Sequence, residues 1–135
     1  VSATTSGGGG GPVDYQAEDG VITNGVVESN HTGFTGRGFV NVDNATGSAL
    51  EITVNAAAAG GADVVVRYSN NTTSTRPVSV SVNGGAGSTL EFPKTADWNT
   101  WATVTVHVNL NAGTNKIKFT STTDNGGPNY DKITV

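Results

Sequence analysis

The chain of 135 residues contains no cysteine and no methionine. Disulfide bridges, thiolate metal sites and a cysteine nucleophile are therefore impossible. Charged residues make up only 13%, and the seven Lys and Arg residues are scattered, so no basic patch for nucleic acid forms. No apolar run approaches the roughly 20 residues that a membrane-spanning helix needs. The sequence predicts neither nucleic acid nor a membrane as a partner.

What the chain does contain favours strands and turns. Glycine occurs 19 times, beside many Thr, Asn, Val and Ser residues. Apolar residues alternate with polar ones around Leu50–Val54, Val78–Val82 and Val104–Leu110, which is the period of half-buried strands. No convincing helix is present. About ten short strands with regular turn signals predict an all-β fold, a sandwich of antiparallel strands.

The chain divides into two parts. Residues 1–12 include five consecutive glycines and predict a flexible linker, whereas 13–135 predict one β-sandwich domain. Such a linker usually tethers a domain to another, often catalytic, domain in the same polypeptide. The alternative is a disordered N-terminus. The low charge and the many hydroxyl and amide side chains suit a secreted, extracellular protein.

The most unusual stretch runs from Glu28 to Asn41. Glycines at 33, 36 and 38 allow close backbone approach, and oxygen-bearing side chains crowd between them. Such a loop can wrap a hard cation or face a polyhydroxyl ligand. Neither a P-loop nor an EF-hand pattern is present. The alternative reading is an ordinary long turn.

Gln16 and Glu18 lie near the start of the domain and point to one face of an extended strand. With Asp131 from the last strand they could supply oxygens to Ca²⁺, which takes six to eight. The alternative is solvated polar residues at a sheet edge.

Two tryptophans lie close together, before the strand that begins near Ala102. Trp98 lies between Asp97 and Asn99, where a flat ring could stack on a sugar or plug the core under a loop. Trp101 adjoins the strand and is predicted to lie in the core.

No catalytic set stands out. His107 alternates with valines on the polar face of a strand and is predicted to be solvated, whereas His31 lies in the glycine-rich loop. No nucleophile elbow is present, and the carboxylates are dispersed among polar loops. The sequence disfavours catalysis.

Several motifs, in order, resemble family 35 carbohydrate-binding modules, relatives of families 6 and 36. The resemblance covers 13–135. It is carried by Tyr15-Gln-Ala-Glu-Asp19, Glu28-Ser-Asn-His-Thr-Gly-Phe-Thr-Gly-Arg-Gly-Phe-Val-Asn41, Trp98-Asn-Thr-Trp101, Leu110-Asn-Ala-Gly-Thr-Asn115 and Asn129-Tyr-Asp-Lys-Ile133. It implies a jelly-roll β-sandwich that acts as a monomeric, non-catalytic module and targets an attached polysaccharide-degrading enzyme to its plant or microbial polysaccharide.

The resemblance also implies two sites. A structural Ca²⁺ would take Gln16, Glu18, Asp131 and a backbone carbonyl near Arg37. A sugar site would be formed by the loops 28–38, around Trp98, and 124–129. Its implied contacts are Trp98, Asn129, Arg37, His31 and Ser29.

Some members of that family bind uronic acids through a second Ca²⁺. Glu28, Asn30 and Asn129 are its implied ligands here, and Arg37 could bond the sugar carboxylate. We therefore expect calcium-dependent recognition of glucuronic or unsaturated galacturonic acid. The alternatives are neutral galactosides or mannans as ligands, or a small calcium-dependent polyuronate lyase.

Overall fold

The computed structural model describes residues 12–135, so nearly all of the predicted linker lies outside the described residues. Eleven strands and one short 3₁₀ turn make up the domain. In chain order they are β1 Asp14–Gln16, η1 Ala17–Asp19, β2 Val21–Thr23, β3 Gly25–Glu28, β4 Phe39–Val42, β5 Ala49–Ala56, β6 Gly60–Ser69, β7 Arg76–Val82, β8 Ser88–Phe92, β9 Ala102–Leu110, β10 Gly113–Ser121 and β11 Asn129–Thr134.

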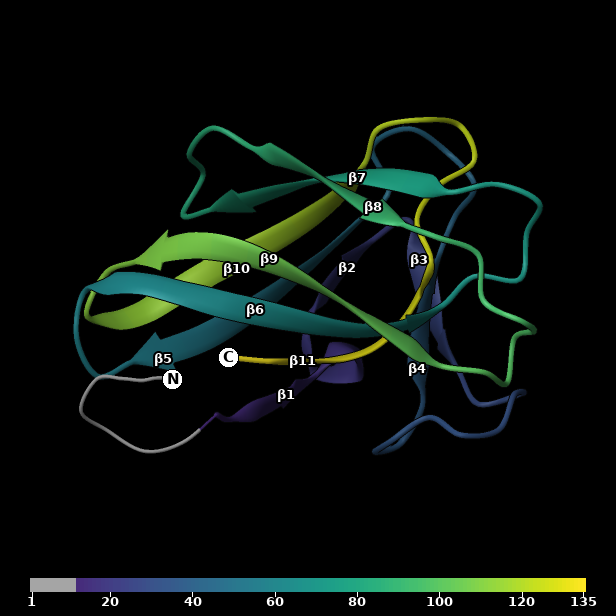
Figure 1. Ribbon diagram of the computed structural model, residues 1–135, viewed down its shortest axis with the longest axis horizontal. Coiled ribbons are helices and arrows are strands. Elements are labelled where there is room, and N and C mark those ends of the chain that lie inside the picture. Colours follow the sequence, from purple (N-terminus) through teal and green to yellow (C-terminus); the bar gives the residue numbers. More distant parts are fainter. Residues whose placement is uncertain (1–11) are drawn as a thin grey trace.

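The strands form two antiparallel sheets packed face to face (Figure 1). The first sheet has the order β3-β4-β11-β6-β9, with β1 also paired to β11, and the second has the order β2-β5-β10-β7-β8. The predicted antiparallel β-sandwich is confirmed. None of the described elements is a helix long and apolar enough to cross a membrane.

The core lies between the sheets and follows the predicted alternation. Leu50, Ile52 and Val54 of β5 are buried, and they face Val64, Val66 and Tyr68 of β6 in one continuous apolar cluster. Burying such side chains contributes about 1.5–3 kcal/mol each. The fold is thus held by inward-facing aliphatic and aromatic residues.

Two short strands follow η1, one in each sheet. The segment Val21–Val27 is interrupted at Asn24, whose φ of 55° breaks the extended run. Asparagine tolerates this left-handed conformation better than most residues. The kink moves the chain from the edge of the second sheet, where β2 pairs with β5, to the edge of the first, where β3 pairs with β4.

Two pairs of loops gather at the end of the sandwich shown on the right of Figure 1. The blue loop 29–38 lies beside the green loop 93–101, and hydrogen bonds join them from Thr32 N to Asn99 and from Trp101 Nε1 to Thr32 O, both 2.8 Å long. Loops 43–48 and 122–128 form the other pair, linked by Asp124 and Thr46. The first pair carries most of the predicted site residues.

Candidate functional site

An aromatic cluster separate from the core lies on the outer face of the first sheet, the face turned away from the second sheet. Phe39 is fully buried, yet it is not part of the core, because its neighbour Val40 points inward instead. His31, Phe34 and Trp101 cover the Phe39 ring, with ring centroids 5.6–5.8 Å from it. The loop 29–38 is therefore anchored on the sheet through Phe39.

Trp98 lies at the edge of this cluster. Its ring stacks on His31 at 6.1 Å and 27°, and it is only half-buried. Trp101 is also half-buried and contacts Phe39 and the guanidinium of Arg67. The prediction that Trp101 lies in the core is wrong, because it packs outside the sheet under the loop. Trp98 is not a buried core plug, and its indole remains partly open to a ligand.

Polar side chains continue the same outer face beyond Phe39. Asn129 of β11 is paired in register with Asn41 of β4 on one side and Ser69 of β6 on the other. Asn129 is 5% exposed, and its amide has no hydrogen-bond partner among residues 12–135. Asn41 donates to Glu28 Oε1 at 2.8 Å. The Asn129 amide atoms are not among the buried atoms that lack a partner, whereas the Oγ of its register neighbour Ser69 is. Because buried polar atoms without a partner are rare, Ser69 and the unbound Asn129 amide together mark this face as a place for a polar ligand.

The second half of the loop 29–38 turns toward the start of the domain. Thr35 donates to Asp131 from its backbone N–H, at 2.7 Å, and from its hydroxyl, at 3.0 Å. The same hydroxyl lies 3.2 Å from Gln16 Oε1. The structure thus brings Gln16 and Asp131 together, with Thr35 between them.

Asp131 owes its position to a β-bulge. The register of β11 against β6 shifts between Tyr130 and Lys132, which leaves Asp131 as the extra residue. Bulges commonly redirect a side chain in this way. The Asp131 carboxylate is fully buried and accepts a bond of 2.7 Å from Arg67, whose guanidinium also reaches Gly33 O. The carboxylate therefore ties the loop to the sheet.

Glu18 completes this oxygen-rich group. Its Oε2 accepts from the Arg37 N–H at 2.8 Å, and a Cβ on Gly36 would clash with it. The amide end of Gln16 lies 3.3 Å from both Glu18 oxygens, with its own oxygen facing them. Such facing acceptors need either a cation between them or a reversed amide that donates to Glu18.

The other predicted residues lie apart from these groups. The Arg37 guanidinium is exposed and pairs with Asp19 at 2.9 Å, on the η1 side rather than toward Trp98. Ser29 and Asn30 are exposed. In the loop 124–129, Asp124 is bound to Thr46, which lowers the pKa of Asp124. His107 is exposed and pairs with Asp63.

Sequence reasoning missed Phe39 and Arg67, and it counted Thr35 and Asn41 only among the oxygen-bearing residues of the loop, without giving them a role in either site. The alternation of β4 gives a usable signal, since Val40 and Val42 in the core place Phe39 and Asn41 on the opposite face. Nothing in the sequence marks Arg67, which reads as one polar position in an alternating strand.

The fold and this outer face define a small β-sandwich with an aromatic and amide surface at one end. The family model for carbohydrate binding module family 6 matches residues 16–135, and the chain belongs to this group, as a module of the family 35 type. The module is a carbohydrate-binding domain and is not itself catalytic. The resemblance drawn from the sequence is confirmed.

Solved structures agree closely. A family 35 module from Clostridium thermocellum is 39% identical, with a TM-score of 0.89 over 93% of this chain and 97% of that one. A module named Xyl-CBM35, solved with a glucuronic acid containing disaccharide, is 35% identical, with a TM-score of 0.83 over 91% of this chain and 92% of that one.

A curated relative shows the setting in which such modules occur. The exo-β-D-glucosaminidase of Amycolatopsis orientalis is 58% identical over 125 residues, which is 92% of this chain. The match covers only 12% of the enzyme's length. In that relative the module is a small part of a much larger enzyme.

Proposed function

We propose that this module binds a terminal uronic acid residue, glucuronic or unsaturated galacturonic, on the outer face beside Trp98. Asn129 carries the proposal, because its amide makes no hydrogen bond among the described residues and lies between Asn41, which donates to Glu28, and the unpaired buried hydroxyl of Ser69. Trp98 would stack on the apolar face of the sugar ring, supported by His31. The glucuronic acid containing disaccharide bound to the similar Xyl-CBM35 supports this ligand class.

Calcium is part of the proposal at two places. Gln16, Glu18, Thr35 and Asp131 present oxygens to one another around Gly36, and a hard cation among these oxygens is the alternative to a reversed Gln16 amide that donates to Glu18. The fit is incomplete, since no cluster of three His, Cys, Asp or Glu side chains forms among residues 12–135. Amide, hydroxyl and backbone oxygens would have to complete the shell.

The second ion would lie at the sugar site. Glu28 offers a half-buried carboxylate there, and Asn129 and Asn30 offer amide oxygens. A cation at this place would offset the net charge of −4, which otherwise opposes an anionic sugar. Arg37 is not part of this set, because its guanidinium is held by Asp19.

We further propose that the module belongs to a secreted polysaccharide-degrading enzyme and holds its catalytic domain on the substrate. Tethering through a flexible linker raises the effective concentration of the catalytic domain near the glycan. The glucosaminidase relative, of which the module forms 12%, supports this arrangement.

Calorimetric titration tests the ligand. We expect glucuronic acid to bind more tightly than galactose or mannose. Repeating the titration in EDTA tests the ion at the sugar site, where the affinity for glucuronic acid should fall at least tenfold. Binding of galactose in preference to glucuronic acid would favour the neutral-glycan alternative, and unchanged affinity after chelation would eliminate the metal-bridged version.

A further inference from the structure

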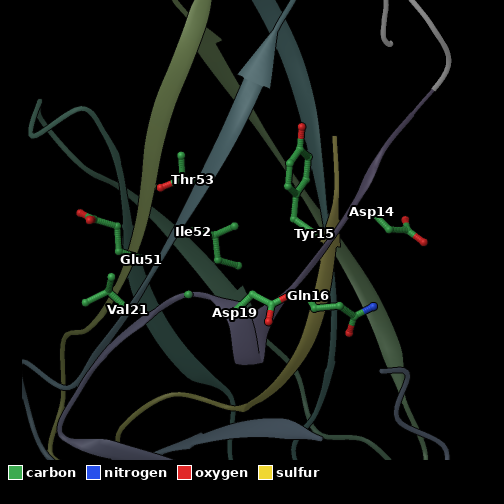
Figure 2. Close-up of a pocket in the computed structure, with 9 residues that line it drawn as sticks. Asp14, Tyr15, Gln16, Asp19, Val21, Glu51, Ile52 and Thr53 are labelled. Carbon is green, nitrogen blue, oxygen red and sulfur yellow. The ribbon is translucent and has the colours of Figure 1, made fainter. Parts of the chain in front are cut away.

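A hollow lies on the flank of the sandwich, away from Trp98. It has a volume of about 250 Å³ and opens between β1 of one sheet and β5 of the other (Figure 2). Tyr15, Ile52 and Thr53 stand around it, with Val21 at one end, and Gly20 also lines it. Ligand pockets for larger molecules start near 300 Å³, so this hollow is sized for a single ring.

The hollow exists because β2 is short. β2 pairs with β5 only from Ala49 to Glu51, so the edge of β5 beyond Glu51 has no strand beside it among the described residues. The Tyr15 hydroxyl accepts from the Asn55 N–H at 3.2 Å and closes the edge there. Alternation then points the N–H and C=O of Thr53 into the gap between Val21 and Tyr15.

A single residue whose backbone N–H and C=O are unpaired at a sheet edge can bind only a ligand with matching hydrogen-bonding groups. An added peptide strand needs several consecutive pairs, and Val21 and Tyr15 block the edge on both sides. In an extended residue the N and O atoms lie on the same side, roughly 3 Å apart. Two neighbouring hydroxyls of a pyranose ring have a similar spacing, and each can donate and accept. A secondary amide cannot match it, because its N–H and C=O point in opposite directions.

The charges of the hollow exclude an acidic sugar. No Lys, Arg or His lines it, whereas three carboxylates do. Asp14 is bound to Lys132 and Thr134, and Asp19 is bound to Arg37, so neither is free to neutralise a cation. In Figure 2 the Asp14 and Glu51 side chains point away from the hollow, whereas the Tyr15 ring and Ile52 form apolar walls.

We propose that this hollow is a second carbohydrate subsite, which takes one neutral pyranose unit through the Thr53 backbone and the Tyr15 ring. It is independent of the proposed uronic acid site. The two sites together would let the module bind one glycan at a uronic acid residue and at a neutral sugar residue. Tyr15 supplies the apolar contact, and Thr53 reads a pair of neighbouring hydroxyls.

Amide chemical-shift mapping tests this with methyl β-D-xylopyranoside as the probe. We expect a saturable shift of the Thr53 amide, with smaller shifts at Gly20 and Val21, in both the parent chain and Trp98→Ala. Glucuronic acid should leave these amides unmoved. Shifts of Trp98 and Asn129 alone, or no saturable shift, would overturn the proposal without touching the uronic acid site.

Thr53→Pro and Thr53→Ala form a matched pair. Proline removes the N–H that faces the gap, and proline is tolerated at an edge position whose N–H faces outward. We expect the xyloside shifts of the Gly20 and Val21 amides to be lost in Thr53→Pro and kept in Thr53→Ala, which retains the amide at position 53. Should Thr53→Pro fail to fold, Tyr15→Leu removes the ring instead and should also abolish the shifts. Undiminished binding in a folded Thr53→Pro or Tyr15→Leu variant would contradict the subsite.

Discussion

The two halves of the loop 29–38 have different roles although they follow each other directly in the chain. The half around Thr35 and Gly36 is enclosed, with Asp131 fully buried and every carboxylate oxygen of that residue bound. The half around His31 ends in a half-exposed indole and an unbound amide at Asn129. Satisfied buried polar groups stabilise a fold, whereas unsatisfied ones at a surface are available to a ligand.

Phe39 and Arg67 hold the two halves together. The Phe39 ring lies under His31, and Arg67 bonds both Gly33 and Asp131. A substitution in the enclosed half should therefore disturb the open half, whereas a substitution in the open half should leave the structure of the enclosed half unchanged. This asymmetry separates stability from binding.

Asp131→Ala should have the largest effect. It leaves Arg67 without its carboxylate and Thr35 without its acceptor, so the free energy of unfolding should fall by about 3–5 kcal/mol. Urea denaturation measures this. Asp131→Asn keeps an acceptor oxygen and should lose less. An alanine variant as stable as the parent would show that the enclosed half is not structural.

Removing calcium should act on the same half. Binding of an ion at 100 times its dissociation constant stabilises a fold by about 2.7 kcal/mol. EDTA should therefore lower the melting temperature of the parent chain, and added Ca²⁺ should restore it. In Glu18→Gln the change in melting temperature caused by EDTA or Ca²⁺ should be smaller. A melting temperature indifferent to both EDTA and Ca²⁺ would leave the reversed Gln16 amide as the better description of that contact.

Trp98→Ala should affect only the open half. Central aromatic contacts commonly cost about 2 kcal/mol when truncated, so the affinity for glucuronic acid should drop about thirtyfold. The melting temperature should change little, because the ring is half-buried at the edge of its cluster. Trp98→Phe keeps a flat ring and should lose less affinity. Equal affinity for glucuronic acid in the parent chain and both variants would show that Trp98 is not part of the binding site.

Asp14→Asn should have the smallest effect. The Lys132 ammonium and the Thr134 hydroxyl lower the pKa of Asp14. A lowered folded-state pKa gives stability that is present above the unfolded-state pKa, near 3.9, and lost as pH falls through the lower folded value. Because the Asp14 side chain is half exposed, we expect less than about 1 kcal/mol, and only at pH values above that unfolded-state pKa. Melting temperatures at neutral and acid pH check this, and an equal loss at both would argue against the ion pair.

Much of the fold could be predicted because strand alternation is local. The run Leu50–Val54 and the turn at Asn83, where φ is 54°, are both legible in the sequence. The break at Asn24 could not be read, because it depends on which sheet each half of the segment joins.

The site was harder to predict because its residues meet through register and a bulge. Asp131 was expected near Gln16 and is found there, but its partner Arg67 comes from a strand with no distinguishing motif. Arg37 looked like a sugar ligand by type and position. Its pairing with Asp19 follows from how the loop returns to η1, which only the three-dimensional structure reveals.

The most direct test of the account is chemical-shift mapping with glucuronic acid on the labelled chain. The account predicts saturable shifts of the Trp98 indole N–H and of the Asn129 side-chain amide, with the Asp131 region unmoved. Saturable binding that leaves both of those groups unshifted would contradict it.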